Sequence, residues 1–579
     1  MSVDVVIPVI GKSVKKGKIL EWLKQEGEPV AQGEPIVVVE AEKVSVEIEA
    51  PASGILAQIL VEAGLEVPIG TRVALIAREG EELAALPAAV AEAERSAVRP
   101  REPVVSAGVG QAPAAGAERH ILIIGGGSGG YMAAIKAAQM GARVTLVEKA
   151  KIGGTCLHTG CMPTKSYLAR AKVLEQIKRL GVFKGQEGVA IDMKKMAAVK
   201  NEAVAELETG LNALLASHGV NIIKGTAQFA DPKQIRTQTA DGQVRETVAD
   251  SVIIATGARP FVPPGIKIDG KYVHTTDTIW NVKKVPRRVL IVGSGAVGVE
   301  FASIFNSLGS KVAVIEMLPQ AMPYLDQEIA AELRGYLEDR GITIRASTQI
   351  MAAEQQRTMV EAVLRGPAGE NKSAYDLVLI AAGRVPVTEG LNLEKVGIQV
   401  EKGGIKVNAR METTATGVYA VGDAVGGLML AHAAFMEALV AVENIMGGVR
   451  EADYAKVPNC IYSFPEFGSV GLTEDEARRR GGEVSVGRFP IYANGKARVS
   501  GDTEGMVKII ADMSTGEILG VHILCDHATE LIGEYALAMT SEVTIEEAAL
   551  TIKGHPTLSE SLTEAAMTLT GGACHLPKN

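Results

Sequence analysis

The sequence predicts a chain that is mainly α/β, with two units of parallel sheet followed by an α+β domain and preceded by a small all-β domain. From His120 onward, short apolar runs alternate with helical patterns, which is typical of helices packed on parallel sheets. Two glycine-rich turns, near residues 125 and 293, lie within this alternation. Residues 1–78 contain short β-type runs and an internal repeat instead. The length of 579 residues also predicts several domains.

Composition narrows the class of protein. Apolar residues make up 47% of the chain and charged residues 22%, the balance of a globular protein with a sizeable core. The net charge of −9 argues against nucleic acid or an acidic membrane as the main ligand. Five cysteines are too few for a disulfide scaffold, and the sequence shows neither a secretory signal nor a membrane-spanning run. We expect a cytoplasmic protein that binds neither nucleic acid nor membrane.

The first 78 residues repeat a glycine pattern. Apolar residues follow the first glycine of each copy. Two similar halves of short strands are therefore expected, as a small sandwich or flattened barrel with quasi-twofold symmetry. The glycines are spaced ten and six residues apart in both copies, with an offset of 37: Gly17, Gly27 and Gly33, then Gly54, Gly64 and Gly70.

The segment that joins the two halves predicts a β-hairpin. Two β-rich runs within residues 36–48 flank a tight polar turn with Lys43 at its tip. This segment resembles the lipoyl/biotinyl carrier domain, whose single modified lysine lies at such a hairpin. Biotinyl carriers have methionine on both sides of that lysine, whereas Glu42 and Val44 stand here, so the resemblance favours a lipoyl group on Lys43. Lipoyl domains more often have aspartate where Glu42 stands.

Residues 79–118 differ in composition from the rest of the chain. Alanine, proline, glutamate and valine dominate, and apolar periodicity is lacking. Prolines interrupt any long helix. We expect a semi-stiff linker that reaches on the order of 100 Å, because about 40 residues can span roughly 3 Å each. Such a linker would let a tethered carrier domain sweep a wide volume.

Two Rossmann-like motifs follow the linker. In each, a buried strand leads into a glycine turn, a helix and a second strand that ends in an acidic residue. N–H groups at the helix N-terminus would bind a pyrophosphate, and the acid would bind ribose hydroxyls. The acid of the second motif would also repel a 2′-phosphate, which favours NAD over NADP there. The residues are Gly125, Gly127, Gly130 and Glu148 in the first motif, and Gly293, Gly295, Gly298 and Glu316 in the second.

The glycine turns alone leave open which motif holds which cofactor. The chain resembles the pyridine nucleotide–disulfide oxidoreductases, in which the first turn binds FAD and the second binds NAD(P)H. Two further FAD-side segments of that family recur at residues 252–257 and 416–423. The resemblance implies that Thr256 and Gly257 lie at the FAD site and that Asp423 bonds the ribityl chain.

Cys156 and Cys161 lie five residues apart, directly after the first motif. On a straight helix their Cα atoms would be roughly 8.6 Å apart, beyond the roughly 7 Å limit for a disulfide, so a bridge requires a distorted turn, which Gly160 permits. A bridge that closes so short a loop restrains little chain entropy, and short strained bridges are the reducible kind. We therefore expect a redox-active pair.

The family resemblance assigns a role to each residue of this centre. It implies that Cys156 exchanges with a dithiol substrate and that Cys161 faces the flavin as a thiolate. Lys165, which also belongs to the FAD site, and Glu300 would form an ion pair near the reactive edge of the flavin. His158 departs from the pattern, because dihydrolipoyl dehydrogenases usually have asparagine there.

A histidine near the C-terminus is a candidate base. Thiol exchange needs a base because a free thiol with a pKa of about 8.5 is mostly protonated at pH 7, and a carboxylate can fix the tautomer of a histidine. His555, followed by Glu560, matches the dyad of the disulfide oxidoreductases, which reaches the disulfide of the other subunit. An obligate homodimer is implied. Lys553 stands where the family often has a second histidine, and Cys574 is expected to be incidental.

The resemblance implies the activity of a dihydrolipoyl dehydrogenase, which oxidises protein-bound dihydrolipoamide and reduces NAD through a disulfide and FAD. The partners would be dihydrolipoyl domains of an acyltransferase or similar component of a 2-oxo acid or acetoin dehydrogenase complex. Alternative interpretations are reduction of another disulfide, of peroxide through a partner or of a metal ion, and a carrier or assembly role. No metal site is expected.

The expected domain boundaries follow from these motifs. The FAD domain is interrupted, because the segment that contains Asp423 comes after the second glycine turn. The domains are a lipoyl carrier at residues 1–78, a linker at 79–118, an FAD domain at 119–270 that continues at 389–455, an NAD domain at 271–388 and an interface domain for dimerisation at 456–579.

Overall fold

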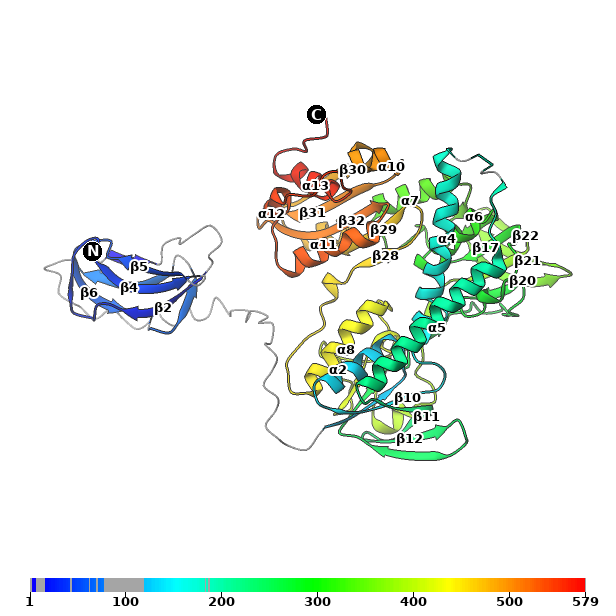
Figure 1. Cartoon of the computed structure of the whole chain (residues 1–579), viewed down its shortest axis with the longest axis horizontal. Coiled ribbons are helices and arrows are strands. Elements are labelled where there is room, and N and C mark those ends of the chain that lie inside the picture. Colours follow the sequence, from blue (N-terminus) through cyan, green and yellow to red (C-terminus); the bar gives the residue numbers. More distant parts are fainter. Residues whose placement is uncertain are drawn as a thin grey trace. The chain divides into compact units, whose positions relative to one another are not determined.

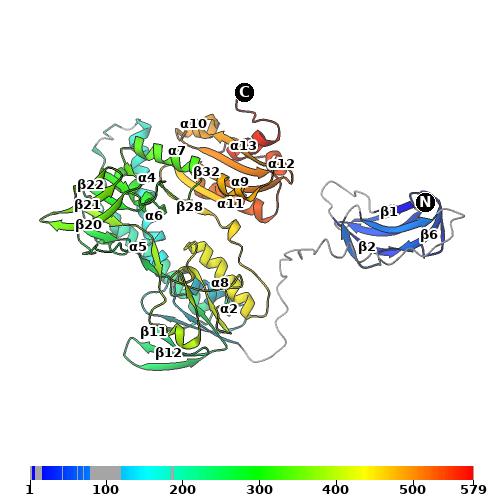
Figure 2. The ribbon, with the colours of Figure 1, turned by 180° about the vertical axis from the view of Figure 1, so that it is seen from behind.

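The computed structural model describes residues 3–6, 16–41, 44–61, 63–68, 71–77, 119–182, 184–185 and 188–577. The chain forms two compact units, residues 1–111 and 112–579, and each is described by itself. Figures 1 and 2 show the ribbon from opposite sides. The large unit is built on three main sheets with helices around them, as the predicted combination of α/β and α+β domains requires.

The N-terminal unit consists of two antiparallel four-stranded sheets around one core. Apolar side chains of both sheets, including Ile19, Val37, Leu56 and Ile76, are fully buried. Successive side chains of a strand point to opposite faces, so one face of each sheet supplies this core. One sheet has the order β1 (Val3–Val6), β8 (Arg72–Ala77), β6 (Gly54–Ile59), β3 (Pro29–Val30), and the other β5 (Val44–Glu49), β4 (Pro35–Ala41), β2 (Lys16–Trp22), β7 (Glu66–Pro68).

The glycine repeat appears in this unit as quasi-twofold symmetry. Gly27 N of the first half donates to Leu56 O of the second half at 2.8 Å. At the equivalent position, Gly64 N of the second half donates to Ile19 O of the first half at 2.8 Å. Both glycines have positive φ, 89° and 94°, in the left-handed region that favours glycine. The predicted repeat of two halves is therefore confirmed. Lys43 and the predicted linker at 79–118 lie outside the described residues.

The first sheet of the large unit leads into the first glycine turn. Its order is β13-β12-β11-β10-β9-β14-β27, and the strands from β11 to β27 are parallel. Strand β9 (His120–Ile124) is buried along its length, as its apolar run predicts. Helices α2 (Ser128–Gln139) and α8 (Ala431–Ile445) lie side by side (Figures 1 and 2). The other strands are β10 (Arg143–Glu148), β11 (Asn221–Asp231), β12 (Gln234–Thr239), β13 (Val244–Val248), β14 (Ser251–Ile254) and β27 (Val418–Ala420).

A second parallel sheet leads into the second glycine turn. Its order is β16-β23-β17-β18-β19. Helix α6 (Ala296–Ser307) follows the turn, and α7 (Gln327–Asp339) begins after Asp326, whose side chain caps it. A three-stranded antiparallel sheet lies between β19 and β23 in the chain. The strands are β16 (Val273–Thr275), β17 (Arg288–Val292), β18 (Lys311–Ile315), β19 (Thr343–Arg345), β20 (Gln349–Gln356), β21 (Met359–Gly366), β22 (Gly369–Tyr375) and β23 (Leu377–Ile380).

The C-terminal part is an antiparallel sheet with the order β28-β29-β32-β31-β30, packed against helices. Helix α11 (Ala528–Thr540) contacts β29 and β32, and α13 (Glu560–Thr570) contacts β30 and β31 (Figure 1). The other elements are β28 (Asn459–Ile461), β29 (Glu466–Gly471), α9 (Glu474–Arg480), β30 (Val484–Pro490), α10 (Gly495–Ser500), β31 (Met506–Asp512), β32 (Glu517–Cys525) and α12 (Ile545–Leu550).

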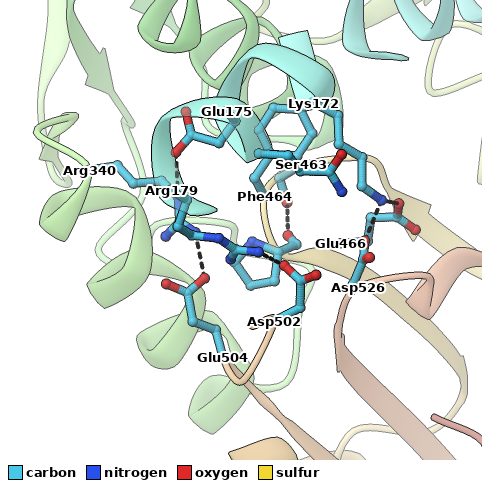
Figure 3. Close-up of a pocket in the computed structure, with 12 residues that line it drawn as sticks. Lys172, Glu175, Arg179, Arg340, Ser463, Phe464, Glu466, Asp502, Glu504 and Asp526 are labelled. Atoms are coloured by element: carbon cyan, nitrogen blue, oxygen red, sulfur yellow. Dashed lines mark hydrogen bonds and ion pairs between the residues drawn. The ribbon is translucent and has the colours of Figure 1, made fainter. Parts of the chain in front are cut away.

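Helix α4 (Cys161–Leu180) connects the first sheet with the C-terminal part. It packs against α5 (Met193–Ser217) and α6. Ion pairs around a pocket tie its second half to the C-terminal part (Figure 3). These contacts fix the position of α4, at whose N-terminus Cys161 lies. The pairs of α4 are Lys172 with Glu466 and Asp526, and Arg179 with Asp502; beside them Arg340, just after α7, pairs with Glu175 of α4 and with Glu504.

Short elements complete the large unit. Strand β15 pairs with β24, and β25 with β26. Within the ranges described above, no helix is long and apolar enough to cross a membrane. The elements are α3 (Gly154–His158), β15 (Ala258–Pro260), η2 (Ile279–Asn281), β24 (Arg384–Pro386), η3 (Leu393–Val396), β25 (Val400–Glu401), β26 (Gly404–Ile405), η4 (Gly422–Val425), η5 (Tyr454–Lys456) and η6 (Ile491–Ala493).

Candidate active site

The two glycine turns have the same backbone geometry. The first glycine of each has a positive φ, 107° at Gly125 and 103° at Gly293, which other residues rarely adopt. The third glycine lies against the first. A Cβ atom on Gly130 would lie 1.8 Å from Gly125 O, and one on Gly298 would lie 1.9 Å from Gly293 O. Only glycine therefore allows strand and helix to approach so closely at either turn.

The middle glycines leave space in front of a helix N-terminus. A Cβ atom on Gly127 or Gly295 would meet no atom within 4 Å, and these residues precede α2 and α6. Free N–H groups and the helix dipole attract phosphate at such a position. Both turns thus fit the pyrophosphate of a dinucleotide.

Each predicted acid lies beside its own turn. Glu148 accepts a hydrogen bond from Gly126 N at 2.6 Å. Glu316, which is 9% exposed, accepts hydrogen bonds from Ser294 N and Ser294 Oγ, both at 3.0 Å. Both carboxylates come from the end of the strand that follows the helix, the position from which an acid binds ribose. The residues present therefore fit two dinucleotides.

The segments after β14 and β27 meet because these two strands are parallel neighbours. Thr256 Oγ1, next to Gly257, donates to Val387 O at 2.6 Å. Asp423 lies in η4, and Arg384 Nε is 3.4 Å from its Oδ2. Burial raises the pKa of Asp423, and Arg384 opposes that effect. This arrangement gathers Thr256, Gly257 and Asp423 on the side of the first glycine turn.

Arg384 is a site residue that the sequence analysis missed. Besides Asp423, its guanidinium donates to Ala258 O and to Thr155 Oγ1, the latter at 3.3 Å. Thr155 immediately precedes Cys156, although it is 229 residues from Arg384 in the chain. Arg384 therefore joins the Asp423 loop to the cysteine segment. A single arginine after β23 carries no local pattern that would have revealed this.

Cys156 and Cys161 lie on different helices. Helix α3 ends at His158, and α4 begins at Cys161. Gly160 N donates to Thr155 O at 2.7 Å at the end of α3, and Thr164 N donates to Gly160 O at 3.1 Å at the start of α4, so the helix changes at Gly160. The predicted distortion is thus a break between two helices, and it brings the two thiols into hydrogen-bond contact.

The two thiols differ in acidity. The hydrogen bond from Cys156 and the charge of Lys165 lower the pKa of Cys161 to about 7, against the opposing effect of burial. The N-terminus of a 20-residue helix favours the thiolate in the same direction. The hydrogen bond to Cys161 and burial raise the pKa of Cys156. In the reduced pair, Cys161 is therefore the more acidic of the two thiols.

Lys165 and Glu300 form an ion pair next to the cysteines. Lys165 Nζ lies 2.8 Å and 2.9 Å from the two oxygens of Glu300, which is 3% exposed. Burial alone would lower the pKa of Lys165, but Glu300 outweighs it, so the pKa is raised and the ammonium stays charged. Tyr462, which the sequence analysis also missed, donates its N–H to Glu300 at 3.1 Å and places its ring 4.4 Å from Nζ. These contacts hold the charge that stabilises the Cys161 thiolate.

His555 and Glu560 form a hydrogen-bonded dyad. His555 Nδ1 lies 2.8 Å from Glu560 Oε1, and Thr557 N donates to Glu560 Oε2 at 2.8 Å. The side chain of His555 is 79% exposed. Among the described residues, neither member has a hydrogen bond or ion pair with Cys156 or Cys161 of its own chain. An exposed base without a thiol in its own chain is consistent with a site shared by two subunits.

A second histidine–glutamate pair also has its glutamate on α13, the helix that begins at Glu560. His575 Nδ1 is 2.7 Å from Glu564 Oε1, and His575 N donates to Glu564 Oε2 at 3.2 Å. Glu564 raises the pKa of His575 through this hydrogen bond. The sequence analysis missed the pair because its members are eleven residues apart and meet only when the tail folds back.

The departures from the family pattern have local partners. His158 Nε2 is 2.8 Å from Ile152 O, and Lys553 pairs with Glu534.

The cysteines outside the redox pair have different settings. Cys460 is partly buried, which raises its pKa to about 11, Cys525 is fully buried and Cys574 is exposed.

Three family models match the chain. Residues 119–438 match the model described as pyridine nucleotide-disulphide oxidoreductase, and residues 457–566 match its dimerisation domain. Residues 3–76 match a model of the biotin/lipoyl family, described as biotin-requiring enzyme.

Curated relatives match the chain over most of their own length. A dihydrolipoyl dehydrogenase of Bacillus subtilis is 39% identical over 459 residues, which cover 79% of this chain and 99% of the relative. One of Thermus scotoductus is 40% identical over 459 residues, or 79% and 98%. A leghemoglobin reductase of Glycine max is 37% identical over 456 residues, or 78% and 87%.

Solved structures cover a similar share of the chain. LpdA of Mycobacterium tuberculosis is 30% identical with a TM-score of 0.73, covering 78% of this chain and 99% of that one. A Cu(II) complex of the flavoprotein disulfide reductase RclA of Escherichia coli is 30% identical with a TM-score of 0.70, covering 78% and 100%. The chain belongs to the pyridine nucleotide-disulphide oxidoreductases, a family that uses FAD and NAD, and has a biotin/lipoyl attachment domain at its N-terminus.

Proposed function

We propose that this chain is a dihydrolipoyl dehydrogenase that carries its own lipoyl domain on Lys43. The observation that carries the proposal is the cysteine pair beside a dinucleotide turn, in which Lys165 and Glu300 favour Cys161 as the thiolate. Such a pair exchanges with a dithiol. The relatives named dihydrolipoyl dehydrogenase and the attachment domain both favour dihydrolipoamide as that dithiol.

In the proposed reaction, a thiolate of dihydrolipoamide attacks Sγ of Cys156 in the oxidised Cys156–Cys161 pair, and Cys161 leaves as a thiolate. The second sulfur of the substrate then attacks the sulfur bound to Cys156 and releases lipoamide. The partner subunit's His555 takes the proton of the first thiol, and the proton of the second passes to Cys156. Two electrons are thereby left on the cysteine pair.

Other side chains prepare these steps. Lys165, fixed by Glu300, stabilises the Cys161 thiolate, and Glu560 accepts the Nδ1 proton of His555 so that Nε2 can act as the base. When bound, FAD passes the two electrons on to NAD. We assign FAD to Gly125, Gly127, Gly130, Glu148, Lys165, Thr256, Gly257 and Asp423, and NAD to Gly293, Gly295, Gly298 and Glu316.

The proposal includes a homodimer and the domain boundaries given above. The match to a dimerisation domain at residues 457–566 supports a dimer, and the exposed His555–Glu560 dyad supports a shared site. The partners would be dihydrolipoyl domains of an acyltransferase or similar component of a 2-oxo acid or acetoin dehydrogenase complex. A mass increase on the peptide that contains Lys43, after expression with lipoate, would test the carrier role.

The activity is tested by NADH formation from free dihydrolipoamide and NAD. Cys156→Ser should abolish it and leave bound FAD in place, because Cys156 accepts the attack of the substrate. Survival of the activity in this variant would refute the mechanism. No turnover of dihydrolipoamide by the wild type, together with rapid reduction of another disulfide, would refute the substrate.

A further inference from the structure

Glu437 on α8 is a buried acid that has no role in the reaction above. It is 3% exposed. Gly422 N donates to Glu437 Oε2 at 2.6 Å, and Tyr454 Oη donates to Oε1 at 2.7 Å. Gly422 immediately precedes Asp423. Glu437 therefore holds the loop that presents a proposed FAD ligand.

Glu437 lies near a second carboxylate, because it bonds Gly422, the residue before Asp423, and the charge of Asp423 acts on it. Burial is the main cause that raises the pKa of Glu437, to about 7, and Asp423 adds to it, while the hydrogen bonds from Tyr454 and Gly422 oppose it. Arg384 lies beside Asp423, whereas no cation pairs with Glu437 among the described residues. Of the two acids, Glu437 is the one without a compensating charge.

The other charged and titratable groups around α8 have partners of their own. Lys136 of α2 lies 3.9 Å from Glu443, and Arg450 lies 3.0 Å from the same carboxylate. Tyr454, which is 39% exposed, donates the hydrogen bond from its hydroxyl to the Glu437 carboxylate. Glu437 is thus bonded to a residue that is partly exposed to solvent.

We propose that Glu437 is a positioning residue that takes up one proton from solvent when two electrons enter FAD, and releases it when they leave for NAD. This inference rests on the proposed binding of FAD at the first glycine turn. Reduction of FAD adds negative charge beside the Asp423 loop and disfavours a second buried negative charge. The electrons come from the cysteine pair and the proton from water, and both leave again in each cycle.

The test is the midpoint potential of bound FAD in the full-length holoprotein, measured by spectroelectrochemical titration from about pH 5.5 to about pH 8.5. In the wild type, the potential should fall more steeply above about pH 7 than below it, because Glu437 takes up an additional proton there. Glu437→Gln should remove this change of slope, since glutamine takes up no proton. Glu443→Gln is the matched control on the same helix and should keep it.

Tyr454→Phe is a second variant, and it tests the inference about Glu437 if Glu437→Gln does not retain FAD. It removes a hydrogen bond that favours the ionised carboxylate, so the change of slope should move to higher pH. The inference would be overturned if the change of slope persisted in Glu437→Gln, or if it occurred at the same pH in Tyr454→Phe as in the wild type. The potential does not depend on which disulfide is the substrate, so failure of the proposed activity with dihydrolipoamide would be seen separately.

Discussion

The two histidine–glutamate pairs, whose glutamates lie on α13, have nearly the same hydrogen bond and different surroundings. Nδ1 lies 2.8 Å from a carboxylate oxygen in His555–Glu560 and 2.7 Å in His575–Glu564. The glutamates are four residues apart, so they lie on the same face of the helix. The hydrogen bond alone therefore does not identify a catalytic base.

What differs is the chain around each histidine. Ala573 and Leu576 flank the His575 segment and pack against the apolar core of the C-terminal part, so the second pair fastens the tail. His555 precedes α13, is 79% exposed and is fixed mainly through Glu560. We expect His555–Glu560 to transfer protons and His575–Glu564 to stabilise the tail.

The largest difference between the pairs should appear when the histidines are replaced. His555→Gln should lower kcat/KM for dihydrolipoamide by about 10²- to 10⁴-fold, the usual contribution of a general base. His575→Gln should leave it within about twofold, as for a surface substitution. Steady-state NADH formation measures both. Equal losses in the two variants would remove the distinction between the pairs.

Replacing the glutamates should give a smaller difference. Glu560→Gln loses a charge-assisted hydrogen bond worth about 1.5–3 kcal/mol, so kcat/KM should fall about 10- to 100-fold. Glu564→Gln is the matched control and should have little effect on kcat/KM. A normal rate in Glu560→Gln, with bound FAD retained, would show that Glu560 does not orient the base.

The smallest effect should be a pH dependence of the tail. Glu564 raises the pKa of His575 above its usual 6.5, so the stabilisation is fully present below pH 6.5 and is lost as the pH rises through the raised value. Hydrogen exchange of residues 571–577, corrected for intrinsic rates, should therefore show weaker protection on the alkaline side. Glu564→Gln should abolish this dependence, and its persistence in that variant would contradict the assignment.

Sequence patterns predicted the parts of the site that are local in the chain. These are the glycine turns and the cysteine pair with its break at Gly160, because short-range geometry determines each of them. The His555–Glu560 dyad is local too, but was recognised through the family resemblance. The ion pair of Lys165 with Glu300 spans 135 residues and came only from the family resemblance. The proposed roles of these residues remain predictions.

The remaining contacts depend on tertiary packing. Arg384 reaches Thr155 across 229 residues, and Glu437 meets Gly422 only because α8 packs beside η4. The ion pairs of α4 likewise join residues from distant segments (Figure 3). A single charged residue within a helical pattern does not indicate which distant group it will contact, so these features required the structure.

The central claim, a redox site completed by the other subunit, is tested most directly with a mixed dimer. One subunit carries His555→Gln and the other Cys156→Ser, with different tags for purification, and NADH formation from dihydrolipoamide is measured. If the base acts across the dimer, one site contains intact cysteines and an intact histidine, and the dimer should have about half of the wild-type activity. If the base acts within its own chain, both sites are defective, and activity no higher than that of the His555→Gln homodimer would contradict the account.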